Sequence, residues 1–366
     1  MTTTADRLEA RFLGSVIGGA VGDALGGPVE GLDFTEIDAR YGWVDDLLPY
    51  EKAPSEHAHF TNHPGSVTDD TRLHAILVGA ILDADGDVVA GDLTRALVTY
   101  ERDHGDTLSR SFVEEYVLKG LYRGRKLAFG GQPTNGAVMG NGAIGLLHAA
   151  DPGAAFAVAY ELAFVTDGYA KESAGIGAAA VSAAMSPGAT PLGIVDAALS
   201  AADRFRRDGP LWRQTIVEHS WAKFEGRPNH VLIETAVAAA RRNGDVRVLR
   251  EALYPVLKVS PVGSEAGQSV AVALAMLVAT DGDYRASVLG AVNYGRDNDS
   301  YATIVGALAG ALHGIEAVPA AWRDTVVSAN PDIDLEGLAR RLATLVRKRH
   351  AQRAAVVEAV GGLIAS

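Results

Sequence analysis

Apolar residues recur with the period of an α-helix over long parts of this chain. In residues 70–81 and again in 299–312, apolar side chains stand three or four positions apart, which places them on one face of a helix. Those side chains are Leu73, Ile76, Leu77 and Ile81, and then Ile304, Leu308 and Leu312. Five further stretches are rich in Ala and Leu, which favour helices, namely residues 175–184, 191–202, 233–242, 269–279 and 335–357.

Alternating β-branched segments bounded by turn residues are scarce, so the pattern predicts an all-α fold. Irregular segments are expected at about residues 30–68, 124–142 and 259–268. No linker rich in Pro and Ser and no repeat divides the chain. We therefore expect a single domain over residues 1–366, ending in a helix at about 333–360.

Composition and charge exclude several classes of protein. The chain has 366 residues, of which 48% are hydrophobic and 21% charged, and it has no cysteine. A cysteine-free chain has no disulfide framework, no thiolate zinc site and no cysteine nucleophile. The net charge of -12 argues against nonspecific binding to nucleic acid or anionic lipid, because both attract basic surfaces.

The chain is expected to be cytoplasmic, without a membrane span. Its first seven residues are polar and do not resemble a secretory signal. The longest runs nearly without polar groups, 269–280 and 301–312, have about a dozen residues each, whereas a membrane-spanning helix needs roughly 20. They are interpreted as buried helices. The basic run 347–349 is interpreted as a solvated helix end.

The chain has 41 glycines, and four of them are regularly spaced. Gly14, Gly18, Gly22 and Gly26 recur every four residues and would therefore lie near one face of a helix. Without a Cβ at these positions, another backbone or a ligand can approach closely. The spacing predicts either tight packing between helices or a wall beneath a ligand pocket.

Two distant segments carry the most informative chemistry. Residues 66–71, Ser-Val-Thr-Asp-Asp-Thr, and 295–300, Gly-Arg-Asp-Asn-Asp-Ser, each place two carboxylates and a hydroxyl directly before an apolar helix. Asp and Ser in such positions often cap the helix. Together, however, the segments offer about six hard oxygen ligands, the kind that Mg²⁺ prefers. Metal binding and helix capping are the two interpretations.

Other acidic and histidine-rich patterns fit known sites less well. Residues 83–87 open like a Ca²⁺ loop, but Val88 and Thr94 replace the Gly and Glu that such a loop requires, so a solvated turn is expected. The DDxxD run of isoprenoid synthases fails at Leu73, and P-loop, HExxH and GxSxG motifs are missing. A loose histidine cluster is interpreted as solvated, with substrate contact or zinc as alternatives. Its members are His57, His59 and His63.

Four segments resemble those of the ADP-ribosylglycohydrolase family. Residues 14–30 are similar to its opening GxxxGDAxGxPxE motif, and 65–72 read GSVTDDTR. Residues 135–145 resemble its central NGAxM loop, and 295–314 its closing GxDxDTxxxxxGxxxGAxxG motif. The resemblance spans about residues 12–325 and implies a single compact, orthogonal helical bundle with two Mg²⁺ ions, or Mn²⁺, in a central cleft.

The resemblance also implies roles for individual residues. One carboxylate assists attack of water on the anomeric carbon of ribose while the ions orient the sugar. The implied metal ligands are Thr68, Asp69, Asp70, Asp297, Asp299 and Ser300. The candidates for the catalytic base are Asp69, Asp70 and Glu30. The implied substrate-binding residues are Asn135, Gly136, Met139, Asp167 and Gly267.

The chain departs from the family pattern in three substrate loops. Gly140 follows Met139 where the family has Arg, Thr166-Asp167 stands where it has Thr-His, and its Gly-Tyr is altered in residues 263–267. We expect a Mg²⁺-dependent hydrolase of the N-glycosidic bond in ADP-ribosylated protein or arginine. The alternatives are a glycosidase for a smaller ribosylated or ADP-ribosylated compound, and a noncatalytic ADP-ribose-binding relative.

Overall fold

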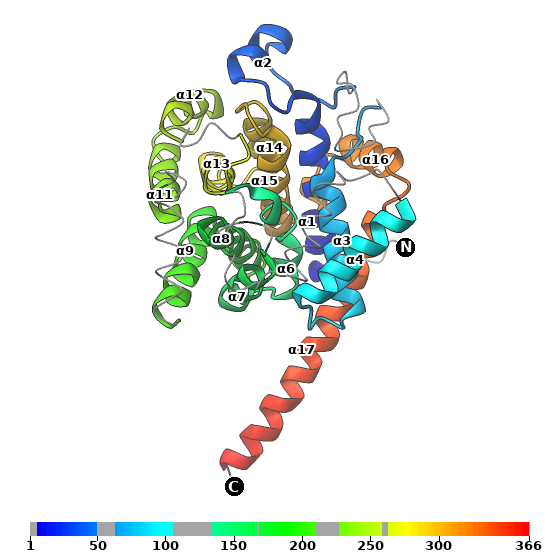
Figure 1. Ribbon diagram of the computed structural model, residues 1–366. Coiled ribbons are helices and arrows are strands. Elements are labelled where there is room, and N and C mark those ends of the chain that lie inside the picture. The colour runs from blue at the N-terminus through cyan, green and yellow to red at the C-terminus, as the bar shows by residue number, and fades with distance from the viewer. Residues whose placement is uncertain are drawn as a thin grey trace.

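The computed structural model describes residues 6–49, 63–104, 133–164, 166, 168–209, 227–257 and 263–365. Helices make up most of this part of the chain, as Figure 1 shows. Extended backbone pairs at isolated bridges, which include one between Asp33 and Gly295 and another between Thr134 and Glu265. The predicted all-α fold is confirmed.

The centre of the fold is a close pair of helices, α1 (Arg7–Gly26) and α15 (Asn298–His313). The glycines of α1 face the backbone of α15 along the whole contact. They pair Gly14 with Gly310, Gly18 with Gly306, Gly22 with Ala302 and Gly26 with Asp299. A Cβ on Gly26 would lie 2.5 Å from the Asp299 Cα, so this glycine is required for the approach. Tight helix packing, predicted from the glycine spacing, is confirmed, and it brings the end of α1 to the start of α15.

One long apolar helix was not singled out by the sequence pattern. Residues Arg7–Val29 form a stretch of 23 residues with mean hydropathy 1.3, long and apolar enough to cross a membrane by length and composition. This stretch does not stand out in the sequence, because the charged residues Arg11 and Asp23 interrupt its run of apolar residues. In the structure its apolar window is entirely buried, since α15 and other helices pack around it.

The remaining helices enclose the α1–α15 pair (Figure 1). On one side α3 and α17 pack against α1, and α4 packs on α3. On the other side α13 packs between α11 and α15, and α8 between α7 and α9. Their bounds are α2 (Phe34–Tyr41), α3 (Asp69–Asp83), α4 (Ala90–His104), α6 (Gly142–Leu147), α7 (Pro152–Leu162), α8 (Gly168–Ala184), α9 (Pro191–Arg207), α11 (Asn229–Ala240), α12 (Val246–Leu257), α13 (Ala266–Ala279), α14 (Tyr284–Val292), α16 (Ala320–Ala329) and α17 (Leu335–Ala365), with short 3₁₀ turns η1 (Gly27–Val29), η2 (Asn135–Ala137) and η3 (Ile315–Ala317).

The structure corrects one expected irregular segment. Residues 30–68 contain the two-turn helix α2, which begins with a capping box: Asp33 accepts from the helix start, and the Asp33 backbone N–H donates to Glu36. Gly42, with φ of 68°, ends the helix. With one fully buried apolar side chain, α2 has too little periodicity to be found from hydrophobic spacing. Helix α17 begins two residues later than expected and extends five residues further.

Two charged features that were each interpreted as solvated bind to one another. Lys348 pairs with Asp85 at 2.7 Å, and Arg349 pairs with Asp87 at 2.8 Å. Arg349 also donates to the backbone carbonyl of Asp85, and Arg347 pairs with Asp6. The basic run of α17 therefore clamps this helix to the α3–α4 turn and to the start of α1. We call these contacts the α17 clamp.

Candidate active site and metal centre

The first acidic segment is held in place by a buried carboxylate on α1. Asp23 accepts hydrogen bonds from the backbone N–H of Thr68 at 3.0 Å and of Thr71 at 3.1 Å, and from the Thr71 hydroxyl. Thr68 caps α3 by accepting from the N–H of Asp70. Asp69 and Asp70 then occupy the first turn of α3, fixed with respect to α1.

The second acidic segment stands at the start of α15. Arg296 adopts φ of 74°, and its backbone N–H and carbonyl bind the backbone of Leu32 and Gly31. This pairing ties the segment to the chain that leaves α1, which carries Glu30. The Asp297 side chain makes no capping hydrogen bond to α15. Helix capping therefore explains Thr68 but does not explain Asp297.

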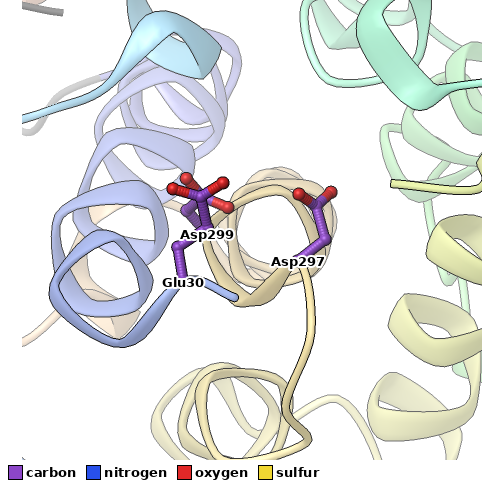
Figure 2. A group of neighbouring side chains, drawn as sticks. All are labelled: Glu30, Asp297 and Asp299. Carbon is purple, nitrogen blue, oxygen red and sulfur yellow. The ribbon is translucent and has the colours of Figure 1, made fainter. Parts of the chain in front are cut away.

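The structure brings the two acidic segments together. Ser300 Oγ on α15 donates to Asp70 Oδ2 on α3 at 3.3 Å. Oxygen atoms of Glu30, Asp297 and Asp299 all lie within 4.8 Å of one another. Figure 2 shows these three carboxylates pointing to the same side at the start of α15. Side chains separated by some 230 residues in sequence thus form one acidic centre.

Burial and mutual repulsion perturb the carboxylates of this centre. Burial, with Asp23 and Glu30, raises the pKa of Asp69 to about 7. Burial, with Glu30, raises the pKa of Asp297 to about 6. The pKa values of Asp70 and Asp299 lie well above the ordinary range, again because of burial and the neighbouring acids. A cation would relieve this repulsion.

The donor set suits a hard divalent cation. Its members are carboxylate and hydroxyl oxygens, and the cluster of Glu30, Asp297 and Asp299 has the dimensions of a metal site. Asp70 Oδ1 is buried, and within the described ranges no group donates a hydrogen bond to it. An ionised carboxylate oxygen in such a position needs a partner, and a metal ion would be one. The acidic centre therefore fits a metal ion.

Comparison with known proteins decides the family. The model of the ADP-ribosylglycohydrolase family matches residues 4–352. The chain belongs to this family. It is 28% identical over 357 residues to YegU, an uncharacterized protein of Escherichia coli (strain K12), with coverage of 94% of this chain and 99% of the relative. It is 30% identical over 323 residues to an uncharacterized protein of Archaeoglobus fulgidus, with coverage of 86% and 91%.

A solved structure described as an ADP-ribosylglycohydrolase-related protein complex has the same fold. The TM-score is 0.60 at 23% identity, and the match covers 93% of this chain and 99% of the other. The resemblance inferred from the four motif segments is thus confirmed. Family membership supports an activity of the glycohydrolase type in general.

Two of the five substrate-binding residues implied by the family resemblance border the acidic centre. The Asn135 side-chain amide donates to Asp297 Oδ2 and to Ser269 Oγ. Met139 Sδ lies 3.8 Å from Ser300 Oγ, as an alternative acceptor to Asp70 for the single Ser300 hydroxyl proton. Both residues come from the central loop around η2, so this loop forms part of the wall of the site.

The other three are placed differently. Gly136 follows Asn135 in η2 and is half-buried. Gly267 stands at the start of α13 and faces α11, where a Cβ would lie 2.7 Å from Asn229 Oδ1. Asp167 lies outside the described residues, as do His57 and His59 of the histidine cluster.

Three tyrosines near the motifs serve packing. Tyr294 and Tyr301 are completely buried and form an edge-to-face pair, and Tyr169 is 1% exposed. Their rings are therefore not presented to a ligand in this structure. The Tyr301 hydroxyl accepts from Gln268 and donates to the carbonyl of Gly263, which holds the start of α13 against α15.

Asp23 is the residue of the site that the sequence reasoning missed. It lies inside the first motif segment and is the only charged residue among the buried positions Phe12 to Gly26 of α1. A lone acid in such an apolar helix was the available signal. Its partners Thr68 and Thr71 are some 45 residues away, beyond any local pattern.

Replacing Asp23 by Asn should weaken Mg²⁺ binding by about 10- to 100-fold, the usual effect of losing a group that positions ligands. An amide presents two donors to a site where Asp23 accepts from several N–H and O–H groups, so the turn before α3 would shift. Isothermal titration with Mg²⁺ measures the effect. Binding equal to that of the wild type would show that Asp23 does not position the ligands.

Proposed function

We propose that this protein is a Mg²⁺-dependent hydrolase that cleaves the N-glycosidic bond between ribose and arginine in ADP-ribosylated protein or free ADP-ribosyl-arginine. The observation that carries the proposal is the joining of two acidic segments into one centre through Ser300 and Asp70. The proposed metal ligands are Thr68, Asp69, Asp70, Asp297, Asp299 and Ser300, with Glu30 close to Asp297 and Asp299.

Bound Mg²⁺ would supply positive charge that orients the ribose hydroxyls and balances the acidic centre. In the proposed reaction, a carboxylate accepts a proton from water as the water oxygen attacks the anomeric carbon. The bond from this carbon to the guanidino nitrogen breaks, and the departing guanidine takes up a proton.

Asp69 and Glu30 are the best placed carboxylates for the role of base. Both are partly exposed, whereas Asp70 is buried and bound to Ser300. A base must reach the proton that it accepts, either directly or through one water molecule. We therefore assign the proton transfer to Asp69 or Glu30, and Asp70 to metal binding.

A second candidate is a glycosidase for a smaller ribosylated or ADP-ribosylated compound. Gly140 supports it: a Cβ there would lie at an ordinary contact distance of 3.6 Å from the backbone of Leu73 and His74, so close packing at this Cβ does not require the glycine. Family members carry an Arg at this position, and its guanidinium group is suited to an anionic pyrophosphate. This chain has Gly140 there and so lacks that positive charge.

A panel of ADP-ribosyl and ribosyl compounds incubated with Mg²⁺ tests both candidates. We expect release of ADP-ribose from ADP-ribosyl-arginine, with at least about a hundredfold loss in Asp69→Asn and in Glu30→Gln. Hydrolysis of a smaller riboside without cleavage of ADP-ribosyl-arginine would support the second candidate and contradict the first. Binding of ADP-ribose without turnover of any compound would contradict both and indicate a noncatalytic reader.

A further inference from the structure

The second half of helix α17 projects beyond the body of the protein (Figure 1). The helix packs on α1 up to the α17 clamp, where Leu335, Leu342 and Leu345 are buried. Beyond the clamp, every side chain described in residues 350–364 is exposed. We call residues 350–365 the tail. The family match ends at residue 352, so the tail lies almost entirely outside the part shared with the family.

The tail carries an apolar stripe in phase with the buried face of α17. At about 100° per residue, its large apolar side chains fall within an arc of about 120°. Leu335, Leu342 and Leu345 fall within the same arc. The stripe consists of Val356, Val357, Val360, Leu363 and Ile364, and its exposed fractions include 71% for Val357 and 82% for Ile364. The face of α17 that packs against the body of the protein thus continues into the tail.

A tail of this composition is a weak helix by itself. Isolated helices of 12 to 15 residues are marginal in water, and each glycine inside a helix costs about 1 kcal/mol. Gly361 and Gly362 are adjacent within the tail, and a Cβ at either would meet no atom within 4 Å. A surface that covers the stripe would therefore stabilise this part of the helix.

We propose that the stripe pairs with the same stripe of a second copy of this chain, as an antiparallel helix pair with Val356 opposite Val360 of the second copy. Arg353 falls on the stripe and decides the orientation. A parallel pair would set two Arg353 guanidinium groups side by side. The antiparallel pair places Arg353 beside the far apolar end of the other tail, which its aliphatic stem covers while the guanidinium reaches water.

The size and charge of the tail favour this partner over a membrane. Two such stripes would bury roughly 1,000 Å² in total, near the lower limit for a specific interface. Helices that lie on anionic membranes carry Lys and Arg along their polar face. Residues 351–365 contain one base, Arg353, and one acid, Glu358, and small residues fill most of the polar face.

The oligomeric state of the full chain tests this pairing. We expect a dimer in light scattering over a series of protein concentrations, and a monomer for Val360→Glu. Ala351→Glu is the matched control, because it adds the same charge on the opposite face of the tail, and it should remain dimeric. A monomeric wild type would overturn the proposal, as would a Val360→Glu protein that stays dimeric. Sedimentation of the wild type with phosphatidylserine vesicles, without dimers in solution, would assign the stripe to membranes instead.

The absence of native cysteine allows the orientation to be tested directly. A mixture of Val356→Cys and Val360→Cys proteins should form a mixed disulfide under mild oxidation. Ile364→Cys alone should not, since an antiparallel pair separates the two Ile364 positions by about 18 Å along the axis. Efficient cross-linking of Ile364→Cys would contradict the antiparallel pair.

Discussion

Replacing Asp70 by Asn should abolish stabilisation of the protein by Mg²⁺ and lower kcat/KM by more than about a hundredfold, because loss of a direct ligand exceeds the effect of losing a group behind it. The same change should make the metal-free protein more stable at neutral pH. Asp70 is buried beside Asp23, Asp69 and Asp297, and all of these raise its pKa, so its charge opposes folding when no cation is bound. An amide retains an acceptor for Ser300 Oγ and carries no charge.

The pH dependence follows from the direction of these shifts. The carboxyl pKa values in the folded protein are higher than the unfolded value of about 4, reaching about 6 for Asp297 and about 7 for Asp69. Their contribution to stability is therefore complete below pH 4 and is lost as the pH rises through 6 and 7. The melting temperature of the metal-free protein should fall over this range. Because Mg²⁺ binds the ionised carboxylates, it should raise the melting temperature more at pH 8 than at pH 5.

Thermal unfolding at several pH values, with chelator or with Mg²⁺, measures both effects. Asp196→Asn provides the matched control, because it removes an exposed carboxylate on α9 and should leave the response to Mg²⁺ unchanged. If Mg²⁺ stabilised Asp70→Asn as strongly as the wild type, Asp70 would not be a metal ligand.

The sequence contains the chemistry of the site but not all of its geometry. The residue types and spacing of the two acidic segments identify the ligand candidates, because the two segments together offer about six hard oxygen ligands. Local patterns do not report that Gly31 and Leu32 bind the backbone of Arg296, which sets Glu30 beside the second segment. Nor do they report Asp23, whose partners lie on another helix.

The same contrast applies to the fold. Helical periodicity predicted α3 and the C-terminal helix, whereas α2 depends on its capping box and on the contact between Tyr254 and Asp33. The sequence indicated only one side of the contact between α1 and α15, because the regular glycine spacing was recognised on α1 alone. Gly306 and Gly310 on α15 complete the contact, and their match to Gly18 and Gly14 is a property of two helices together.

Replacing Gly22 by Ala should destabilise the protein by about 3 kcal/mol or more, one of the largest effects expected for a single methyl group. A Cβ at Gly22 would overlap the backbone of Ala302 and lie 2.9 Å from the N atom of Thr303. The methyl group has no flexible neighbour to displace, so α1 and α15 must separate. The acidic centre should suffer too, because Asp299 stands one turn away on the same contact.

Gly19→Ala is the matched control on the same helix. Its Cβ would meet the Ala307 Cβ and the Thr303 carbonyl at 3.5 Å, which is ordinary van der Waals contact. Because Ala favours helices over Gly, this variant should retain or slightly gain stability, by up to about 1 kcal/mol. Urea unfolding of the two variants measures the difference. Equal stability would mean that α1 and α15 are not held at backbone contact, and that another feature of the fold fixes the position of Asp299.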